Sequence, residues 1–290
     1  MRKKNVLGVI LAGGIGSRLY PMSSVGSKHF LSIYDKPMIF YPLSVLMLSG
    51  IKDYIIVTQK KNIRTYKTVL KNAHRLGINI KYKIQNKALG IAHGLKIASN
   101  NTKKDIVLIL GDNIFYGHGF NVILKNFMKF ESEGQILINQ VRDPKNFGIL
   151  SYDKKGQPLK IIEKPKKFVG NDAVVGLYFY KNSALKYLNK VRLSNRKEYE
   201  ITDFNNILLK KKLISYQRIG RGFAWLDTGD PSRLLEASNF IEIIEKRQGF
   251  KVACLEEIAL RQNFISKKQF INLLKIIPDS DYKKYLKNLI

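Results

Sequence analysis

Residues 6–19 read VLGVILA followed directly by GGIGSRL. A short apolar run rich in β-branched residues and closed by glycines predicts a buried strand that ends in a tight loop. Glycine lets backbone N–H groups approach a ligand closely, and Arg18 adds a forked cation that suits phosphate. We therefore expect a phosphate-binding loop at the carboxyl end of a first parallel strand.

Two common phosphate-binding motifs do not match this loop. The dinucleotide fingerprint requires G-x-G-x-x-G, but counting from Gly14 the last position is Leu19. The P-loop requires G-x-x-x-x-G-K-[ST], and the sequence contains no such run. The loop therefore belongs to neither class.

Strand-like and helix-like segments alternate along the first half of the chain. The strand-like segments are 54–58, 80–84, 106–110 and 136–141. The helix-like segments between them are 63–75, 90–99 and 120–130. Helices between buried strands imply right-handed crossovers and a mainly parallel sheet.

The pattern changes after residue 141. Three further strand-like segments follow with short connections, at 148–152, 158–163 and 173–180. Short connections favour antiparallel pairing, because parallel neighbours need long crossovers. A helix is expected over 201–212.

Segment 232–247 predicts the clearest helix of the second half. The apolar side chains expected on its buried face are Leu235, Phe240, Ile241 and Ile244. Gly249 stands where it would end the helix, and short helices with a break at Pro278 are expected beyond it. Because the sequence shows no low-complexity linker and no internal repeat, we expect one continuous α/β domain over residues 1–290.

The formal net charge of +29 over 290 residues raises the question of a polyanionic partner. The Lys-Lys pairs are spread along the whole chain, and no recognition-helix or aromatic RNA motif is present. We therefore expect a solvated basic surface that attracts anionic substrates, and no nucleic-acid partner.

Cysteine content and hydropathy point to the cytoplasm. Cys254 is the single cysteine, which excludes an intramolecular disulfide and leaves no cysteine cluster for zinc. No apolar stretch approaches the roughly 20 residues that a membrane helix requires, so no membrane partner is expected. The basic start of the chain resembles a signal peptide, but the glycine-rich loop stands where a cleavage site would be.

Four polar groups accompany the first loop. They are Ser27-Lys28-His29, Gly111-Asp112-Asn113, Glu163-Lys164-Pro165 and residues 225–229, which read WLDTG. Loops at the carboxyl ends of strands converge on one crevice in an open α/β sheet. Asp112 and Asp227 would there offer oxygen ligands to Mg²⁺, with Arg18, Lys28 and Lys164 as cations.

Each of these residues alone has a simpler explanation. An aspartate after a strand is most often a helix cap or a turn residue. A lone lysine in so basic a chain is most often a surface residue. Their joint occurrence in this order favours a common site.

Longer blocks carry a resemblance to a known family. They are LAGGIGSRL (11–19), YDKPMIFYPLSVLMLSGI (34–51), LGDNIFYGH (110–118), EKP (163–165), GLYFY (176–180), EITDFN (200–205) and RGFAWLDTG (221–229). In these blocks the chain resembles the sugar-1-phosphate nucleotidylyltransferases, and closely the short glucose-1-phosphate thymidylyltransferases. The similarity extends over essentially all 290 residues.

The resemblance implies a fold and a reaction. The fold would be a three-layer, Rossmann-like nucleotidyltransferase fold with a mainly parallel, mixed central sheet and a sugar-side lobe. Residues of about 1–140 would bind nucleotide, and about 141–290 would form the sugar-binding and C-terminal helical part. The enzyme would join dTTP and glucose 1-phosphate into dTDP-glucose, the first step towards dTDP-rhamnose and cell-surface polysaccharide. It would use Mg²⁺, assemble as a homotetramer and bind dTDP-rhamnose as a feedback inhibitor.

The resemblance also implies residue roles. The catalytic residues would be Arg18, Lys28, Asp112, Lys164 and Asp227, of which Asp112 and Asp227 would hold the metal. The nucleotide-binding residues would be Leu11, Gly13, Gly14, Gln85 and Gly90. The residues that bind the sugar phosphate would be Gly148, Glu163, Lys164, Val174 and Arg196.

The sequence departs from the family at a few positions. His29 stands where the family usually has Gln, Leu89 replaces an acidic residue before Gly90, and Val175 stands where Thr is frequent. Two alternatives for the substrates therefore stay open: the enzyme transfers a uridylyl group, or it is a thymidylyltransferase that acts on another hexose 1-phosphate. A nucleic-acid-binding protein and a catalytically silent nucleotide sensor are the alternatives from other classes.

Overall fold

A nine-stranded mixed sheet lies at the centre of the protein, whose computed structural model describes residues 5–129 and 131–290. Its strands are β1 (Val6–Ala12), β4 (Asp53–Thr58), β5 (Asn79–Ile84), β6 (Asp105–Leu110), β8 (Gly134–Gln140), β9 (Gly148–Tyr152), β10 (Pro158–Glu163), β11 (Asp172–Tyr180) and β12 (Ile214–Arg218). The main spatial order is β10-β9-β11-β6-β1-β4-β5, and β8 pairs with both β11 and β12. Two short antiparallel pairs lie outside this sheet: β2 (Ser32–Ile33) with β3 (Lys36–Pro37), and β7 (Asn113–Gly117) with β13 (Phe223–Asp227).

The predicted parallel part of the sheet is formed by β1, β4, β5 and β6 of the first half, whereas β8, which was expected to belong to it, pairs antiparallel with β11 and parallel with β12. β1 pairs in parallel with β4 and β6, and β4 pairs in parallel with β5. Successive side chains of a strand point to opposite faces, so Val9 and Ile10 of β1 enter different core clusters. Burial on both faces explains why β1 and β6 read as continuous apolar runs.

The second half adds the predicted antiparallel strands. β11 pairs antiparallel with β6 on one side and with β8 on the other. β9 and β10 form an antiparallel pair that joins the sheet at Ala173 of β11. The register of β11 against β8 shifts between Val174 and Tyr178, which marks a β-bulge. Strand β11 of the second half therefore pairs with two strands of the first half, β6 and β8, and also with β9 of its own half.

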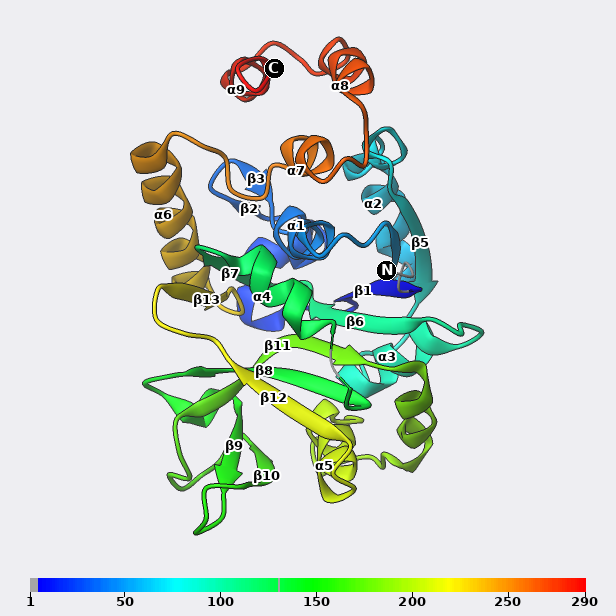
Figure 1. Cartoon of the computed structure of the whole chain (residues 1–290), viewed down its shortest axis with the longest axis vertical. Coiled ribbons are helices and arrows are strands. Elements are labelled where there is room, and N and C mark those ends of the chain that lie inside the picture. Colours follow the sequence, from blue (N-terminus) through cyan, green and yellow to red (C-terminus); the bar gives the residue numbers. More distant parts are fainter. Residues whose placement is uncertain (1–4, 130) are drawn as a thin grey trace.

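Helices cover both faces of the sheet (Figure 1). One face carries α1 (Phe40–Leu48), α2 (Ile63–Val69), α4 (Phe120–Phe127) and α7 (Leu255–Arg261). Helices α8 (Lys267–Leu274) and α9 (Asp281–Lys287) lie beyond α7, farther from the sheet (Figure 1). The opposite face carries α3 (Ile91–Ser99), α5 (Ile201–Lys210) and a 3₁₀-helix over Asn182–Lys190. The predicted three-layer α/β class is confirmed. Across the described residues, no helix has both the length and the apolar character needed to span a bilayer.

Helix α6 (Pro231–Gln248) corrects one prediction about its buried face. Leu235 is 62% exposed, whereas Leu234, Ala237 and Ile241 pack with β2 and β7 in a third core cluster. Positions 234, 237 and 241 follow the i, i+3, i+7 spacing of one helix face, and position 235 lies outside it. Gly249 ends the helix as predicted, in the left-handed conformation with φ of 70°.

Two expected helices are also shorter than predicted. The helix expected over 120–130 ends at Phe127, and position 130 lies outside the described residues. The helix expected over 63–75 is interrupted. Helix α2 ends at Val69, and a separate 3₁₀ turn follows over Ala73–Leu76. Gly77, with φ of 70°, closes that turn before β5 begins. The interruption lets the chain turn back to the sheet within a few residues.

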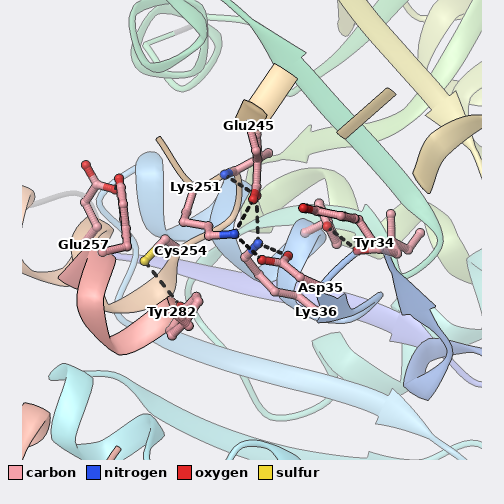
Figure 2. A network of polar contacts seen from close by, with 12 residues as sticks. Tyr34, Asp35, Lys36, Glu245, Lys251, Cys254, Glu257 and Tyr282 are labelled. Carbon is pink, nitrogen blue, oxygen red and sulfur yellow. Dashed lines mark hydrogen bonds and ion pairs between the residues drawn. The ribbon is translucent and has the colours of Figure 1, made fainter. Parts of the chain in front are cut away.

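Buried charges connect β3 to α6 (Figure 2). Lys36 and Glu245 have side chains only 3% and 4% exposed, and Lys36 Nζ lies 2.8 Å from Glu245 Oε1. Lys36 also pairs with Asp35, and Lys251 bonds to Asp35 at 2.6 Å and to Glu245 at 2.7 Å. Burial tends to raise the pKa of Asp35, but the bonds from Lys251 and Lys36 outweigh it and lower that pKa. Asp35 therefore stays ionised within this network at neutral pH.

We expect Lys36→Met to destabilise the fold by about 3–5 kcal/mol, because it leaves Glu245 buried with one cation fewer. The free energy of unfolding in a denaturant titration measures this. The matched control is Lys246→Met, because the Lys246 side chain is 66% exposed and pairs with Glu242 at 2.6 Å on the surface of α6. Exposed pairs contribute little, so the control should unfold like the parent chain. Equal loss in both variants would contradict the role given to the buried network.

Candidate active site

A two-stranded ribbon brings the two predicted carboxylates together. β7 and β13 pair antiparallel, and their register sets Asp227 opposite Asn113. The Thr228 N–H and hydroxyl both donate to the carbonyl oxygen of Asp112, at 3.1 and 2.8 Å. Residues far apart in the sequence therefore lie side by side at the carboxyl end of β6.

Each of these carboxylates has its own cation. Lys28 Nζ pairs with Asp112 Oδ2, and Arg233 Nη1 lies 2.7 Å from Asp227 Oδ2. Burial tends to raise the pKa of Asp112, but Lys28 outweighs it and lowers that pKa to about 2. Burial and the negative charge of Asp112 raise the pKa of Asp227 above its ordinary value. Like charges close together disfavour joint ionisation, so the two carboxylates titrate as a coupled pair.

Arg18 lies beside the second carboxylate. A Cβ placed on Gly229 would lie 2.5 Å from Arg18 Nη2 and 3.1 Å from Asp227 Oδ1. The guanidinium and the carboxylate therefore approach each other across Gly229, where only a glycine leaves room. The glycine-rich loop after β1 thus places Arg18 at the paired aspartates.

A chain of side-chain hydrogen bonds holds Asp112 in place. Trp225 Nε1 donates to Asn113 Oδ1 at 2.6 Å, and Asn113 Nδ2 donates to Asp112 Oδ1 at 3.0 Å. Because Asn113 is buried and uses both ends of its amide, its orientation is fixed. Trp225, which is the single tryptophan of the chain, therefore supports the site from β13.

A polar cleft extends from the paired aspartates towards β9, β10 and α5. Among the predicted site residues, those lining it are Arg18, Asp112, Gly148, Glu163, Lys164, Val174, Arg196 and Asp227. Lys28 is not among these lining residues, but it forms an ion pair with Asp112, which is. All catalytic and sugar-phosphate residues predicted from the sequence therefore lie in or directly against one cleft.

The Glu163 carboxylate, at the far end of the cleft, accepts hydrogen bonds with both of its oxygens. Its Oε2 accepts from the Thr202 hydroxyl at 2.6 Å, and its Oε1 accepts from Arg196 Nη1 at 3.2 Å. Arg196 also faces Glu198 at 3.3 Å and Glu200 at 3.7 Å. Burial tends to lower the pKa of Arg196, but Glu200 and its neighbours outweigh it and raise that pKa.

Lys164 enters the cleft from a strained position. It follows β10 with φ of 45°, a left-handed conformation that costs energy for a residue with a side chain. Its N–H donates to the Phe147 carbonyl at 2.9 Å, which anchors this backbone. This hydrogen bond therefore stabilises the left-handed backbone conformation, and that conformation directs the lysine towards the cleft.

The predicted nucleotide-binding residues form a second group beside the cleft. They are Leu11, Gly13, Gly14, Gln85 and Gly90, at the carboxyl ends of β1 and β5 and at the start of α3. None of these five described residues lines the cleft. Ile91, which follows Gly90, does line it. The two groups therefore adjoin at the first turn of α3.

His29, where the chain departs from the family, is buried. Its Nδ1 lies 2.7 Å from Ser27 Oγ. Burial, with the nearby charge of Lys28, lowers the pKa of His29 to about 3, so the imidazole is neutral at pH 7. It supports the segment that carries Lys28 and is not poised to exchange protons near neutral pH.

Several residues of the site were not predicted from the sequence. Arg233 follows Asp227 by six positions, in the first turn of α6, whose Asp230 side chain accepts from the Arg233 N–H. An arginine just after a helix cap was a signal that could have pointed to it. Thr202 contacts Glu163 only through the tertiary fold, so no local pattern indicates it. Asn113 stands in the predicted Gly111-Asp112-Asn113 group, but its hydrogen bond from Trp225 depends on the tertiary fold.

The fold and the cleft of paired aspartates among cations define a nucleotide-handling transferase, and the chain belongs to the nucleotidyl transferase family, whose model matches residues 7–243. Its similarity to glucose-1-phosphate thymidylyltransferases is confirmed over almost its whole length. The Xanthomonas campestris enzyme is 42% identical over 280 residues, which cover 96% of this chain and 95% of that protein. The Neisseria meningitidis enzyme is 39% identical over 284 residues, covering 98% and 99%.

Solved structures agree with these relatives. A Bacillus anthracis crystal structure, described as a glucose-1-phosphate thymidylyltransferase in complex with sucrose, superposes with a TM-score of 0.74 and 33% identity. That match covers 81% of this chain and 94% of the other. A UDP-glucose pyrophosphorylase with bound UDP-glucose reaches a TM-score of 0.71 at 21% identity, over 82% and 98% of the chains, and shows the shared fold.

We expect Gly176→Ala to disturb the site through Asn113. A Cβ at this position of the β11 bulge would lie 2.5 Å from Asn113 Oδ1, the atom that accepts from Trp225. The displaced amide would release Trp225, so tryptophan fluorescence should change together with a loss of thermal stability. Gly220→Ala is the control, since its added Cβ meets no atom within 4 Å. An unchanged emission spectrum in Gly176→Ala would contradict this account.

Proposed function

We propose that this chain transfers the thymidylyl group of dTTP to α-D-glucose 1-phosphate, giving dTDP-glucose and pyrophosphate. The observation that carries the proposal is the meeting of Asp112 and Asp227, with Lys28 and Arg18, at one end of a polar cleft. The names of the similar proteins point to the same reaction.

The chemistry requires alignment and charge neutralisation, and no general base. A phosphate oxygen of glucose 1-phosphate is already ionised at pH 7 and attacks the α-phosphorus in line. A new P–O bond forms as the bond to pyrophosphate breaks, so no proton needs to move. The protein has to position two anions and stabilise the charge that grows on the leaving pyrophosphate.

Cations of the cleft divide this work. Arg18 and Lys28 lie at the paired aspartates, where we place the triphosphate, and they would stabilise the leaving pyrophosphate. Lys164 lines the same cleft next to Glu163 in the chain, where it would orient the attacking phosphate. Arg196, held among three carboxylates, would release part of that pairing to meet the sugar phosphate.

The residues at the aspartate pair fit Mg²⁺. In the described parts of the chain, no group of three or more His, Cys, Asp or Glu side chains surrounds a metal position. Mg²⁺ needs only one or two carboxylates, because waters and substrate phosphates complete its octahedron. Asp112 and Asp227 would hold it. Burial and the charge of Asp112 together raise the pKa of Asp227, and a divalent cation would relieve the repulsion between the two carboxylates. When bound, the ion would act as a Lewis acid on the phosphate oxygens.

The remaining residue roles follow from their places in the structure. Leu11, Gly13, Gly14, Gln85 and Gly90 would bind the nucleoside, beside the glycine-rich loop. Gly148, Glu163 and Val174 would contact the glucose hydroxyls at the far end of the cleft. We retain the division into a nucleotide part, about 1–140, and a sugar part, about 141–290, with Asp227 reaching back to the first.

Assembly into a homotetramer and feedback binding of dTDP-rhamnose stay predictions from the family resemblance. The basic surface, with a formal charge of +29, would raise the local concentration of both anionic substrates.

The reaction is tested by measuring pyrophosphate release with dTTP, UTP, dCTP and ATP, each crossed with glucose, galactose and mannose 1-phosphates. We expect the highest kcat/KM with dTTP and glucose 1-phosphate. Equal turnover with UTP would replace the thymidylyl assignment by a uridylyl one. Absence of turnover with every pair, in a folded protein supplied with Mg²⁺, would refute transferase activity.

We expect Asp227→Asn to lower kcat/KM by about 10²–10³-fold, since removing one preorganised charge partner in other enzymes has effects of this size. Pyrophosphate release measures the loss, and thermal unfolding should be close to that of the parent chain. Asp230→Asn is the control with the same change of charge, because Asn also caps helices well. A loss of tenfold or less at Asp227 would remove it from the metal site.

A further inference from the structure

The side-chain amide of Gln85 has a fixed orientation. Gln85 is buried directly after β5, and its Nε2 lies 3.3 Å from the carbonyl oxygen of Gly90. A carbonyl oxygen can only accept, so the amide nitrogen, and not the amide oxygen, must face it. The same Nε2 lies 3.1 Å from Nδ1 of His93. Both amide hydrogens are therefore used inside the protein.

The orientation of Gln85 also determines the state of His93. Because Gln85 Nε2 donates, His93 Nδ1 must accept, and the neutral ring carries its proton on Nε2. Burial and the nearby Lys96 lower the pKa of His93, which keeps Nδ1 unprotonated at pH 7. The ring also stacks on Tyr199, with ring centroids 6.0 Å apart. His93 is thus a fixed acceptor on α3.

The amide oxygen of Gln85 is left facing a gap between two glycines. A Cβ on Gly13 would lie 2.6 Å from this oxygen, and one on Gly94 would lie 3.5 Å from it. Within residues 5–129 and 131–290, no hydrogen bond is made to the oxygen. It therefore offers a bare acceptor beside the glycine-rich loop, at the carboxyl ends of β1 and β5, where open α/β sheets bind ligands.

We propose that His93 is a positioning residue for base selection, which holds the Gln85 amide so that only its oxygen faces the nucleotide base. An acceptor there complements a pyrimidine that presents an N–H donor at N3, as thymine and uracil do. Cytosine presents a lone pair at N3 and would face the oxygen with like polarity. This inference rests on the proposed function, because it assumes that a nucleoside triphosphate binds at Gln85.

The alternative is that His93 only packs against Tyr199 and α3. In that case its removal would weaken all nucleotides equally, or would lower stability alone. If His93 positions Gln85, its removal leaves only the 3.3 Å bond to the Gly90 carbonyl to hold the amide, so the amide turns over more readily and either end can face the base. Discrimination between dTTP and dCTP should then fall, while the rate of the chemical step changes little.

The experiment compares the parent chain, His93→Ala and His93→Gln, with Ser99→Ala on the same helix as control. The readouts are kcat and KM for dTTP and the inhibition constant of dCTP against dTTP, which needs no turnover of dCTP. We expect His93→Ala to raise KM for dTTP about tenfold, as for the loss of one oriented hydrogen bond, with kcat within about threefold. The ratio of the dCTP inhibition constant to KM should fall about tenfold.

His93→Gln supplies an amide oxygen that can accept from Gln85, so it should restore most of the discrimination. Ser99→Ala should match the parent chain in every readout. An unchanged ratio in His93→Ala, whatever the change in KM, would overturn the inference. Failure of the parent chain to use dTTP while it uses another nucleotide would instead overturn the proposed function, so the two failures are distinct.

Discussion

The site depends on the register of the β7–β13 ribbon. By setting Asp227 opposite Asn113, this pairing places two carboxylates side by side in a partly buried position. Two like charges there are tolerable only with cations beside them, and Lys28 and Arg233 meet this need from different ends of the chain. The ion pairs thus connect the first loop, β6, β13 and α6 at one point. The same electrostatic demand supports the proposal that a divalent cation and a triphosphate bind at this point.

The parallel half of the fold could be predicted from the sequence because its signals are local. Residues 106–110 form a short apolar run that is typical of a strand buried on both faces, and Asp112 follows at its carboxyl end. Because the carboxyl ends of parallel strands converge, Arg18, Lys28 and Asp112 could be predicted to lie near one another from the first half of the sequence alone. Glu163 at the end of β10 was predicted in the same way.

Other features could not be predicted because they depend on contacts between distant segments. The pairing of β7 with β13 is a matter of register between residues more than a hundred positions apart, and no local periodicity encodes it. Leu235 was assigned to the buried face of α6, whereas Leu234 occupies it, because the helix packs at an angle that the apolar residues alone do not specify. The burial of Glu245 in the same helix would have seemed unfavourable without Lys36 and Lys251.

The pairing of strand β11 with β6 and β8 limits how the cleft can open for substrate binding and product release. It is hydrogen-bonded to β6 on one side and to β8 on the other, so the two halves of the chain share one continuous ladder. Rotation of the halves against each other, as in hinged two-lobed enzymes, would break that ladder along its length. The cleft must therefore open and close by movement of the loops at its rim, such as the segment that carries Arg18. Product release then depends on loop motion above a rigid sheet.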